Sequence, residues 1–246
     1  MEYGLQLYSV RDLAEKNLEK ALRQVSALGY QFVEFAGFFG HSAEEVKRML
    51  DENGLTVSGT HTGWEELLPE RIEETIAYHK TLGNTNIIIP WGDYSTGEKL
   101  ETAIAALNEA QPRLAKEGIA LGYHNHHFEF ETTDYGVCAF EEMRSRTNVE
   151  FEIDTYWAWV AGLDPIELLE QLKGRVRVIH LKDGWKDHTG KSLGEGDAPV
   201  AEVRKYAIEN GLRIVEESEG LDPTGIEEVA RCSRYLKNAD AEDANA

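Results

Sequence analysis

The sequence has little of the chemistry that binds nucleic acid or cross-links a small extracellular fold. Its 25 lysines and arginines face 45 aspartates and glutamates, a formal net charge of −20, so no basic groove for a phosphate backbone is expected. Its two cysteines, Cys138 and Cys232, fall in two expected helices far apart in the chain. This spacing favours buried thiols over a disulfide and suits a reducing compartment. We therefore expect a cytoplasmic protein without a nucleic-acid partner.

Long apolar runs and domain-splitting segments are also missing. No run of 18 apolar residues occurs, and the first four residues carry no basic cluster, so neither a membrane span nor a secretory signal is predicted. No linker, low-complexity stretch or repeat divides the 246 residues, and 41% of them are hydrophobic, enough for a substantial core. We expect one domain over residues 1–246, with the small, polar segment 238–246 as a frayed tail.

Hydrophobic periodicity alternates between strand and helix along the whole chain. Strands are predicted at 3–10, 32–35, 55–61, 86–91, 119–126, 149–157, 176–183 and 212–217, and helices at 17–28, 43–52, 70–82, 96–116, 140–146, 165–173, 198–210 and 224–236. Eight strands alternating with helices in one domain predict an α/β fold, a (β/α)8 TIM barrel. An open doubly wound sheet is disfavoured, because Gln6–Arg11 stands where its glycine-rich phosphate turn would be. Gly194-Glu195-Gly196 is weak evidence for nucleotide binding.

Two of these strands place a carboxylate beside an imidazole. In 149–157, Asp154 shares a face with the other acidic residues, and in 176–183 His180 shares a face with Lys182. The helix between them makes a strand–helix–strand unit, so the strands are expected to be parallel neighbours. Asp154 and His180 would then lie a few ångströms apart and form the start of a metal site.

Polar or aromatic residues follow the apolar beginnings of the other strands as well. Barrel enzymes carry their chemistry at these carboxyl ends, and burying so many unpaired polar groups at one mouth is costly. A single histidine or glutamate here is more often a solvated loop residue, but the set as a whole suits a divalent ion such as Mn²⁺, Mg²⁺, Co²⁺ or Zn²⁺. The residues are Gln6, Glu34, His61, Trp91, His124, His126, Asp154, His180, Lys182 and Glu216.

Six motifs together resemble the sugar phosphate isomerase/epimerase family, the xylose-isomerase-like barrels that share their fold with endonuclease IV. The resemblance runs from Tyr3 to about Leu236 and implies one divalent metal held by a Glu, an Asp, a His and a second Glu. Asp154, His180 and Glu216 match three of these positions. The motifs are 4-GLQLYSVR-11, 123-YHNHHFEF-130, 152-EIDTYWA-158, 179-IHLKD-183, 194-GEG-196 and 214-IVE-216.

The first ligand of the family does not match. The family's epimerases carry Glu-Asn-His or Glu-Pro at the end of strand five, where this chain has His124-Asn125-His126. Either His124 is a ligand, or the chain bends so that Glu129 is; we favour Glu129 because the loop 125–130 gives it reach. The expected metal ligands are therefore Glu129, Asp154, His180 and Glu216.

The resemblance implies a metal-dependent isomerase or epimerase of a sugar or keto-sugar that works through an enediolate. His124, His126, Glu216 and Lys182 are the expected catalytic groups, and Gln6, Glu34, His61, Trp91 and Trp157 the expected substrate-binding residues. The departure at strand five leaves room for a dehydratase or lyase acting on an inosose or a 3-keto-glycoside. A nuclease of the endonuclease IV type and a non-catalytic carbohydrate-binding barrel rank behind these. The sequence leaves open a homo-oligomer, the substrate's identity and whether it is phosphorylated.

Overall fold

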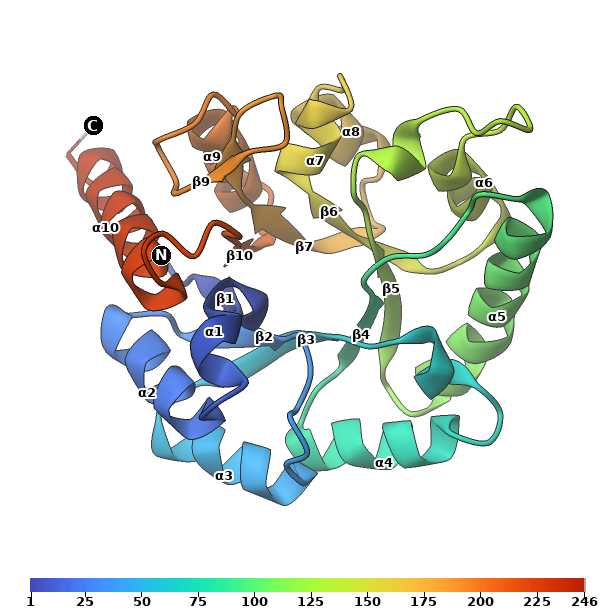
Figure 1. Cartoon of the computed structure of the whole chain (residues 1–246), viewed down its shortest axis with the longest axis horizontal. Coiled ribbons are helices and arrows are strands. Elements are labelled where there is room, and N and C mark those ends of the chain that lie inside the picture. The colour runs from blue at the N-terminus through green and yellow to red at the C-terminus, as the bar shows by residue number, and fades with distance from the viewer. Residues whose placement is uncertain (246) are drawn as a thin grey trace.

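The computed structural model describes residues 1–245 and shows a closed barrel of parallel strands surrounded by helices (Figure 1). The hydrogen-bonded order around the barrel is β1-β10-β7-β6-β5-β4-β3-β2. The predicted (β/α)8 fold is therefore confirmed. The strands are β1 (Gly4–Gln6), β2 (Phe32–Phe35), β3 (Thr56–His61), β4 (Asn86–Ile89), β5 (Ala120–His124), β6 (Glu150–Asp154), β7 (Val176–Leu181) and β10 (Arg213–Glu216).

The helices pack on the outside of the barrel, and local sequence sets their ends (Figure 1). Ser42 and Glu45 form a capping box at the start of α3, and Gly29 ends α2 in the left-handed conformation. None of the helices within residues 1–245 is long and apolar enough to cross a membrane. They are α1 (Arg11–Ala14), α2 (Leu18–Leu28), α3 (Ala43–Glu52), α4 (Ile72–Leu82), α5 (Gly97–Lys116), α6 (Ala139–Arg146), α7 (Thr155–Val160), α8 (Pro165–Gln171), α9 (Val200–Glu209) and α10 (Gly225–Asp243).

Shorter elements lie in the loops at the barrel mouth. Three 3-10 helices, η1 (Leu7–Val10), η2 (Trp64–Leu67) and η3 (Phe128–Phe130), follow β1, β3 and β5. The loop after β7 contains a small antiparallel hairpin of β8 (Asp183–Gly184) and β9 (Gly190–Lys191).

The strands separate two groups of buried apolar side chains. The main core lies between the strands and the helices, whereas Phe32, Val178 and Val215 form a separate small cluster. They lie two residues before Glu34, His180 and Glu217, respectively. Residues two apart on a strand share a face, so both sets face the barrel interior. The interior therefore has an apolar floor and a polar mouth. Gly4 belongs to the floor, since a Cβ there would lie 2.2 Å from the Phe32 ring.

Most of the expected strands are shorter in the structure, and two of them end where a polar side chain begins a helix. The predicted strand 3–10 ends at Gln6, because its side chain accepts a hydrogen bond from the Tyr8 amide and begins η1. The predicted strand 149–157 ends at Asp154, whose Oδ1 accepts a hydrogen bond from the Trp157 amide at 2.9 Å and caps α7. Asp154 therefore keeps its other carboxylate oxygen, Oδ2, for the mouth.

The carboxyl-terminal segment differs from the expected frayed tail. Residues 238–243 continue α10, and Asp240 receives a hydrogen bond of 2.6 Å from the hydroxyl of Tyr3. Arg204, which is buried, forms ion pairs with both Asp240 and Asp243. These contacts fix the end of α10 to Tyr3 near the amino terminus and to Arg204 in α9. Ala246, the last residue of the expected tail, lies outside the described residues.

Candidate active site

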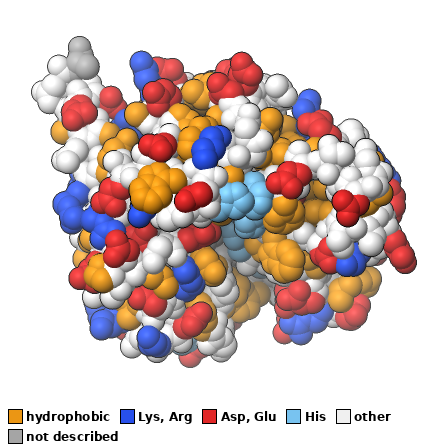
Figure 2. Space-filling model, turned by 45° about the horizontal axis from the view of Figure 1, so that its top comes forward, with side chains coloured by type: hydrophobic (Ala, Val, Ile, Leu, Met, Phe, Trp, Pro, Cys, Tyr) orange, Lys and Arg blue, Asp and Glu red, His pale blue; other side chains and the backbone are white. Residues whose placement is uncertain are grey.

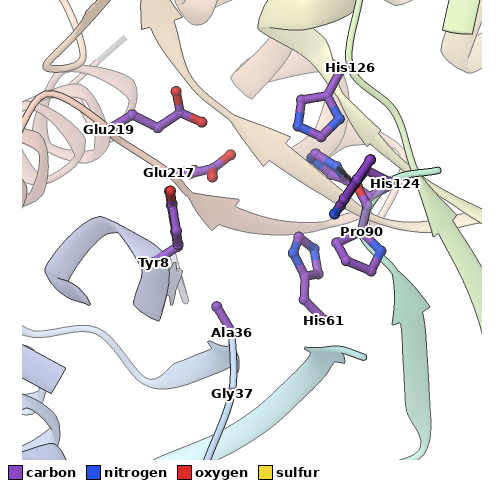
Figure 3. Close-up of a pocket in the computed structure, with 10 residues that line it drawn as sticks. Tyr8, Ala36, Gly37, His61, Pro90, His124, His126, Glu217 and Glu219 are labelled. Atoms are coloured by element: carbon purple, nitrogen blue, oxygen red, sulfur yellow. Dashed lines mark hydrogen bonds between the residues drawn. The ribbon is translucent and has the colours of Figure 1, made fainter. Parts of the chain in front are cut away.

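The polar mouth contains a cavity of about 410 Å³ at the carboxyl ends of the strands. Figure 2 shows histidine side chains gathered at a hollow on this face, bordered by acidic and hydrophobic residues. In Figure 3, Glu217, Glu219 and Tyr8 lie on one side of the cavity, and His61, His124 and His126 on the other. The lining residues are Tyr8, Ala36, Gly37, His61, Pro90, Trp91, His124, His126, Glu217 and Glu219.

Four buried side chains at this mouth are arranged as metal ligands. His124, Asp154, His180 and Glu217 each offer one ligand atom, and these atoms lie within 4.8 Å of one another. They come from the ends of four adjacent strands, since Asp154 pairs with His180, and His180 with Val215, across the ladder. Carboxylate and imidazole donors without a thiolate suit a hard or borderline divalent cation.

The hydrogen bond of His124 shows that this set fits a cation. Its Nδ1 lies 3.1 Å from the carbonyl oxygen of Pro90, and a carbonyl only accepts, so Nδ1 carries the proton and Nε2 presents a lone pair. That Nε2 faces Asp154 Oδ2 at 3.7 Å. Neither atom has a hydrogen-bond partner within residues 1–245, although both are buried. Two facing acceptors without a donor are unfavourable unless a positive charge is shared between them.

His180 has the ring orientation expected of a metal ligand. Its Nδ1 lies 3.0 Å from Glu217 Oε2, and its Nε2 lies 2.8 Å from Glu34 Oε1. A ligating histidine commonly donates its second ring N–H to a carboxylate, which fixes its tautomer and orientation. Donation from Nε2 to Glu34 leaves Nδ1 on the side of His124, Asp154 and Glu217.

Beneath this set lies a second polar layer built on Glu34, His61 and Glu152. His61 Nε2 is 2.8 Å from Glu152 Oε2 and 3.2 Å from Glu34 Oε1, and Gln6 donates to Glu34 at 2.6 Å. His61, His124, Glu152 and His180 also bring ligand atoms within 4.8 Å. In that set, His61 and Glu152 bond to each other, whereas the upper set contains the facing acceptors His124 Nε2 and Asp154 Oδ2, so the upper set is the better cation site.

The two carboxyls of this layer differ in protonation. Burial opposes ionisation of Glu34, but His180 and His61 beside it lower its pKa to about 2. Burial and the neighbouring Glu34 raise the pKa of Glu152 well above its ordinary value. Burial also lowers the pKa of His61 to about 3, so this ring is neutral. Glu34 is therefore the ionised carboxylate that receives the His180 N–H.

Glu217 and Lys182 form a charged pair above the layer. Burial works against the ionised form of Glu217, but Lys182 and His180 hold its pKa well below the usual range. Burial likewise opposes the Lys182 ammonium, yet Glu217, Asp154 and Glu219 raise the pKa of this lysine. Lys182 Nζ lies 2.6 Å from Glu219 and 4.6 Å from the centre of the Trp157 ring. Lys182 is a fixed cation here rather than a base.

His126 is the partly exposed imidazole of the mouth, and its ring stacks on that of Phe128. Burial opposes its protonation, but Glu129 and Asp154 raise its pKa above the ordinary histidine value. An imidazole whose pKa is raised by neighbouring carboxylates can hold a proton and deliver it to a substrate.

Glu129 and Glu216, two of the expected ligands, lie outside the four-residue set. Glu129 is turned back under the loop by η3, where it accepts hydrogen bonds from the Tyr123 hydroxyl and the His126 amide, each at 2.8 Å. Glu216 faces the helices and accepts a hydrogen bond of 2.7 Å from the Tyr30 hydroxyl. The strand alternates at this point, so Glu217 rather than Glu216 points into the barrel. The structure thus brings together Asp154 and His180 of the expected ligands, with His124 and Glu217 in place of the other two.

The remaining expected site residues lie at different depths within the barrel mouth. His61 and His126 border the cavity, as does Trp91, whose ring is 58% exposed. Gln6 and Glu34 are fully buried beneath it, where Gln6 donates to Glu34 and Glu34 Oε1 lies 2.8 Å from His180 Nε2. Trp157 is buried under Lys182. Sequence reasoning missed Glu152, Glu217 and Glu219 as site residues, although strand alternation from Asp154 and Val215 could have indicated the first two.

A family model described as the xylose isomerase-like TIM barrel matches residues 22–236. The chain belongs to this family. The resemblance inferred from its motifs is therefore confirmed.

Several known proteins are similar over most of the chain. A sugar phosphate isomerase/epimerase from Parabacteroides distasonis superposes with a TM-score of 0.82 and 27% identity, covering 96% of this chain and 97% of that one. The rhizopine catabolism protein MocC of Rhizobium meliloti is 26% identical over 87% of this chain and 71% of its own length. The inosose dehydratase of Geobacillus kaustophilus is 22% identical over 67% of this chain, which spans 61% of that protein. The expectation that the chain is an enzyme of this family is confirmed by these relatives.

Proposed function

We propose that this enzyme uses a divalent cation to isomerise or epimerise a sugar or keto-sugar through an enediolate. The observation that carries the proposal is the pair of facing acceptors, His124 Nε2 and Asp154 Oδ2. His180 and Glu217 complete this set of four ligand atoms. These four residues would hold the ion. When bound, it would supply a Lewis acid that polarises a ketone and a neighbouring hydroxyl.

The residues around the ion site have separate tasks in this proposal. Glu217 is an ionised carboxylate at the cavity wall and takes the proton from the carbon beside the carbonyl. Lys182 stays an ammonium and donates to the oxygen on which negative charge develops. His126, on the other side of the cavity, delivers a proton to the neighbouring carbon or oxygen (Figure 3). Trp91 offers an exposed aromatic face to the C–H side of a sugar ring.

One observation favours a second candidate, a dehydratase or lyase of an inosose or 3-keto-glycoside. Two ligands of the set are imidazoles, and Asp154 already uses one carboxylate oxygen to cap α7. Only Glu217 remains as a carboxylate base on the ion site, so proton exchange between two carboxylates across a sugar carbon is not available. A single base together with His126 as the acid suits removal of a proton followed by protonation of a leaving hydroxyl.

Exchange with deuterated water tests both candidates. A ketose or inosose incubated with the enzyme in D₂O should gain deuterium beside its carbonyl if the enzyme isomerises or epimerises it, and should lose water or a glycosidic substituent if the enzyme is a lyase. The reaction should stop with EDTA and resume with Mn²⁺ or Co²⁺. A substrate that is turned over without either change at that carbon would refute the enediolate mechanism.

A further inference from the structure

Many barrel enzymes bind a substrate phosphate with the loops after their seventh and eighth strands and with a helix amino terminus nearby. In this barrel those positions are the loop 182–199, which follows β7, and the segment 217–225, which leads from β10 into α10. Both positions are filled by carboxylates of the chain itself.

The loop after β7 wraps its backbone amides around Asp183. Asp183 Oδ1 accepts from the amides of Gly184 and Ala198 at 2.8 and 3.2 Å, and Oδ2 from those of Gly194 and Gly196 at 2.8 and 3.1 Å. A Cβ on Gly196 would lie 2.3 Å from Asp183 Oδ1. The Gly194-Glu195-Gly196 motif, which is weak evidence for nucleotide binding, thus forms part of an anion-binding nest of backbone amides. The anion in this nest is the Asp183 carboxylate of the same chain.

The amino terminus of α10 is occupied in the same way. The Gly225 amide points to Asp12 Oδ2 at 3.4 Å, and the Asp222 amide just before the helix donates to Glu228 Oε2 at 3.3 Å. Thr224 caps the Glu227 amide. Asp12 and Glu228 therefore supply the negative charge that a helix amino terminus attracts, and Glu228 is buried.

Histidine is the only basic side chain among the described residues that line the cavity. None of its lining residues within the described chain is lysine or arginine, while two of them, Glu217 and Glu219, are acidic. Lys182 is paired with Glu219 at 2.6 Å. Arg11 donates to the carbonyl oxygens of Tyr8 and Glu219 at 2.8 and 3.0 Å and lies over the Tyr8 ring.

We propose that the enzyme acts on a free, uncharged keto-sugar or inosose and not on a sugar phosphate, because no described lining residue of the cavity is lysine or arginine and Asp183 already fills the amide nest of the loop after β7. The inference rests on the proposed function for the keto-sugar, but its argument about phosphate comes from loops outside the ion site. A phosphate ester would have to place its charge beside Glu219 without a donor nest to compensate, and such like-charge contacts are strongly unfavourable.

Matched pairs of substrates test the inference directly on the metal-loaded enzyme. Fructose with fructose 6-phosphate, and ribulose with ribulose 5-phosphate, are compared by deuterium exchange in D₂O. The free ketose should have a kcat/KM at least ~100-fold above that of its ester. A ketose phosphate that exchanges as fast as the free ketose, or faster, would overturn the inference while leaving the proposed function intact. If neither the ketoses, nor their phosphates, nor an inosose exchange, the proposed function fails. The effect of formate and phosphate on the melting temperature of Asp183→Ala would still decide the role of Asp183.

The nest is tested separately with formate and inorganic phosphate as probes. Asp183→Ala should lower the melting temperature, and either anion should restore part of the loss by binding the emptied amides. Sodium chloride at equal ionic strength should not. Asp187→Ala is the matched control, because it removes an exposed negative charge from the same loop without opening the nest. Wild type and the control should show no such stabilisation.

Two results would contradict the internal-anion role. One is an Asp183→Ala protein that neither anion stabilises, and the other is a wild-type protein that phosphate stabilises as much as it does the variant. Should Asp183→Ala not fold, Asp183→Asn keeps the shape of the side chain and should melt below wild type with a smaller gain from formate. The substrate pairs need no variant at all.

Discussion

Glu216 and Glu217 are adjacent in sequence, yet they lie on opposite faces of the same barrel wall. Glu216 faces the helices, where burial raises its pKa to about 7 and Tyr30 is its hydrogen-bond donor. Glu217 faces the interior, where Lys182 and His180 keep it ionised despite burial. A buried carboxylate at this strand end is therefore kept ionised on the inner face, where cations and imidazoles converge, and has a raised pKa on the outer face.

The same contrast appears after β5. His124 points inward with a free Nε2, whereas Glu129, five residues later, is bonded to Tyr123 behind the loop. Tyrosine hydroxyls satisfy the outward carboxylates, and histidine rings face the inward ones. Glu217 and His124 on the inner face can therefore be varied at the site. Glu216 and Glu129, which face outward beside them, supply the control variants.

The largest expected effect is at Glu217. Glu217→Gln should lower kcat/KM by ~10²–10⁴-fold, the range of a lost general base, and should also weaken the bound metal. Glu216→Gln keeps a group that accepts the Tyr30 hydrogen bond and should retain metal and rate within a few fold. Steady-state kinetics and metal analysis of both proteins check this. Equal losses in the two variants would show that the strand faces are not distinguished as described.

The next effect concerns the fourth ligand. His124→Asn should reduce metal affinity by at least ~10-fold, because even indirect losses around metal sites reach that size. Glu129→Gln keeps an acceptor for Tyr123 and should leave the affinity unchanged, with at most a modest loss of stability. Chelator competition measures both. Loss of metal from the Glu129 variant alone would restore the ligand set expected from the motifs.

A smaller effect is expected beneath the site, at Glu34. Glu34→Gln retains the shape but weakens the charge-assisted bond to His180 Nε2, so metal affinity should fall by ~10-fold. The KM should change less than kcat, because Glu34 is buried and does not reach the cavity. A variant with unchanged metal affinity and raised KM would instead favour the substrate contact expected from the sequence.

The barrel and two of the four candidate ligands follow from sequence because both depend on short-range periodicity. Strand alternation places Asp154 and His180 on the inner face of neighbouring parallel strands, and the structure shows them there. The same alternation, counted from Val215, points to Glu217; matching the family motif one residue too early selected Glu216. No local pattern revealed that η3 and Tyr123 turn Glu129 away, since that depends on a loop conformation.

The carboxyl-terminal segment shows another limit. Small polar residues at 238–246 favour fraying when read alone, but Asp240 pairs with Tyr3 and Arg204, which are distant in sequence. Such contacts override local composition. The sequence also does not show how deep a side chain lies within the mouth. Glu34 and His61 come from neighbouring strands, yet Glu34 contacts His180 from below, whereas His61 borders the cavity.

The last expected effect is on stability alone and concerns a buried histidine outside the site. His79 in α4 lies on the outer side of the barrel, 2% exposed, with its Nδ1 3.0 Å from the Asn84 amide nitrogen. Asn84 can only donate there, so the ring is neutral, and burial lowers its pKa from 6.5 to about 4. The unfolded chain therefore binds more protons than the folded one between these values, and the contribution of His79 to stability is complete above pH 6.5 and is lost as the pH falls toward 4.

The loss should amount to ~3 kcal/mol from the size of the shift. His79→Gln retains an acceptor for Asn84 but cannot titrate, so the free energy of unfolding from urea melts should fall less steeply than in wild type between pH 6.5 and 4. Acid effects on the carboxylates are common to both proteins and cancel in the comparison. Parallel curves for the two proteins over this range would mean that His79 titrates alike folded and unfolded, and that burial on the outer face does not by itself keep a histidine neutral.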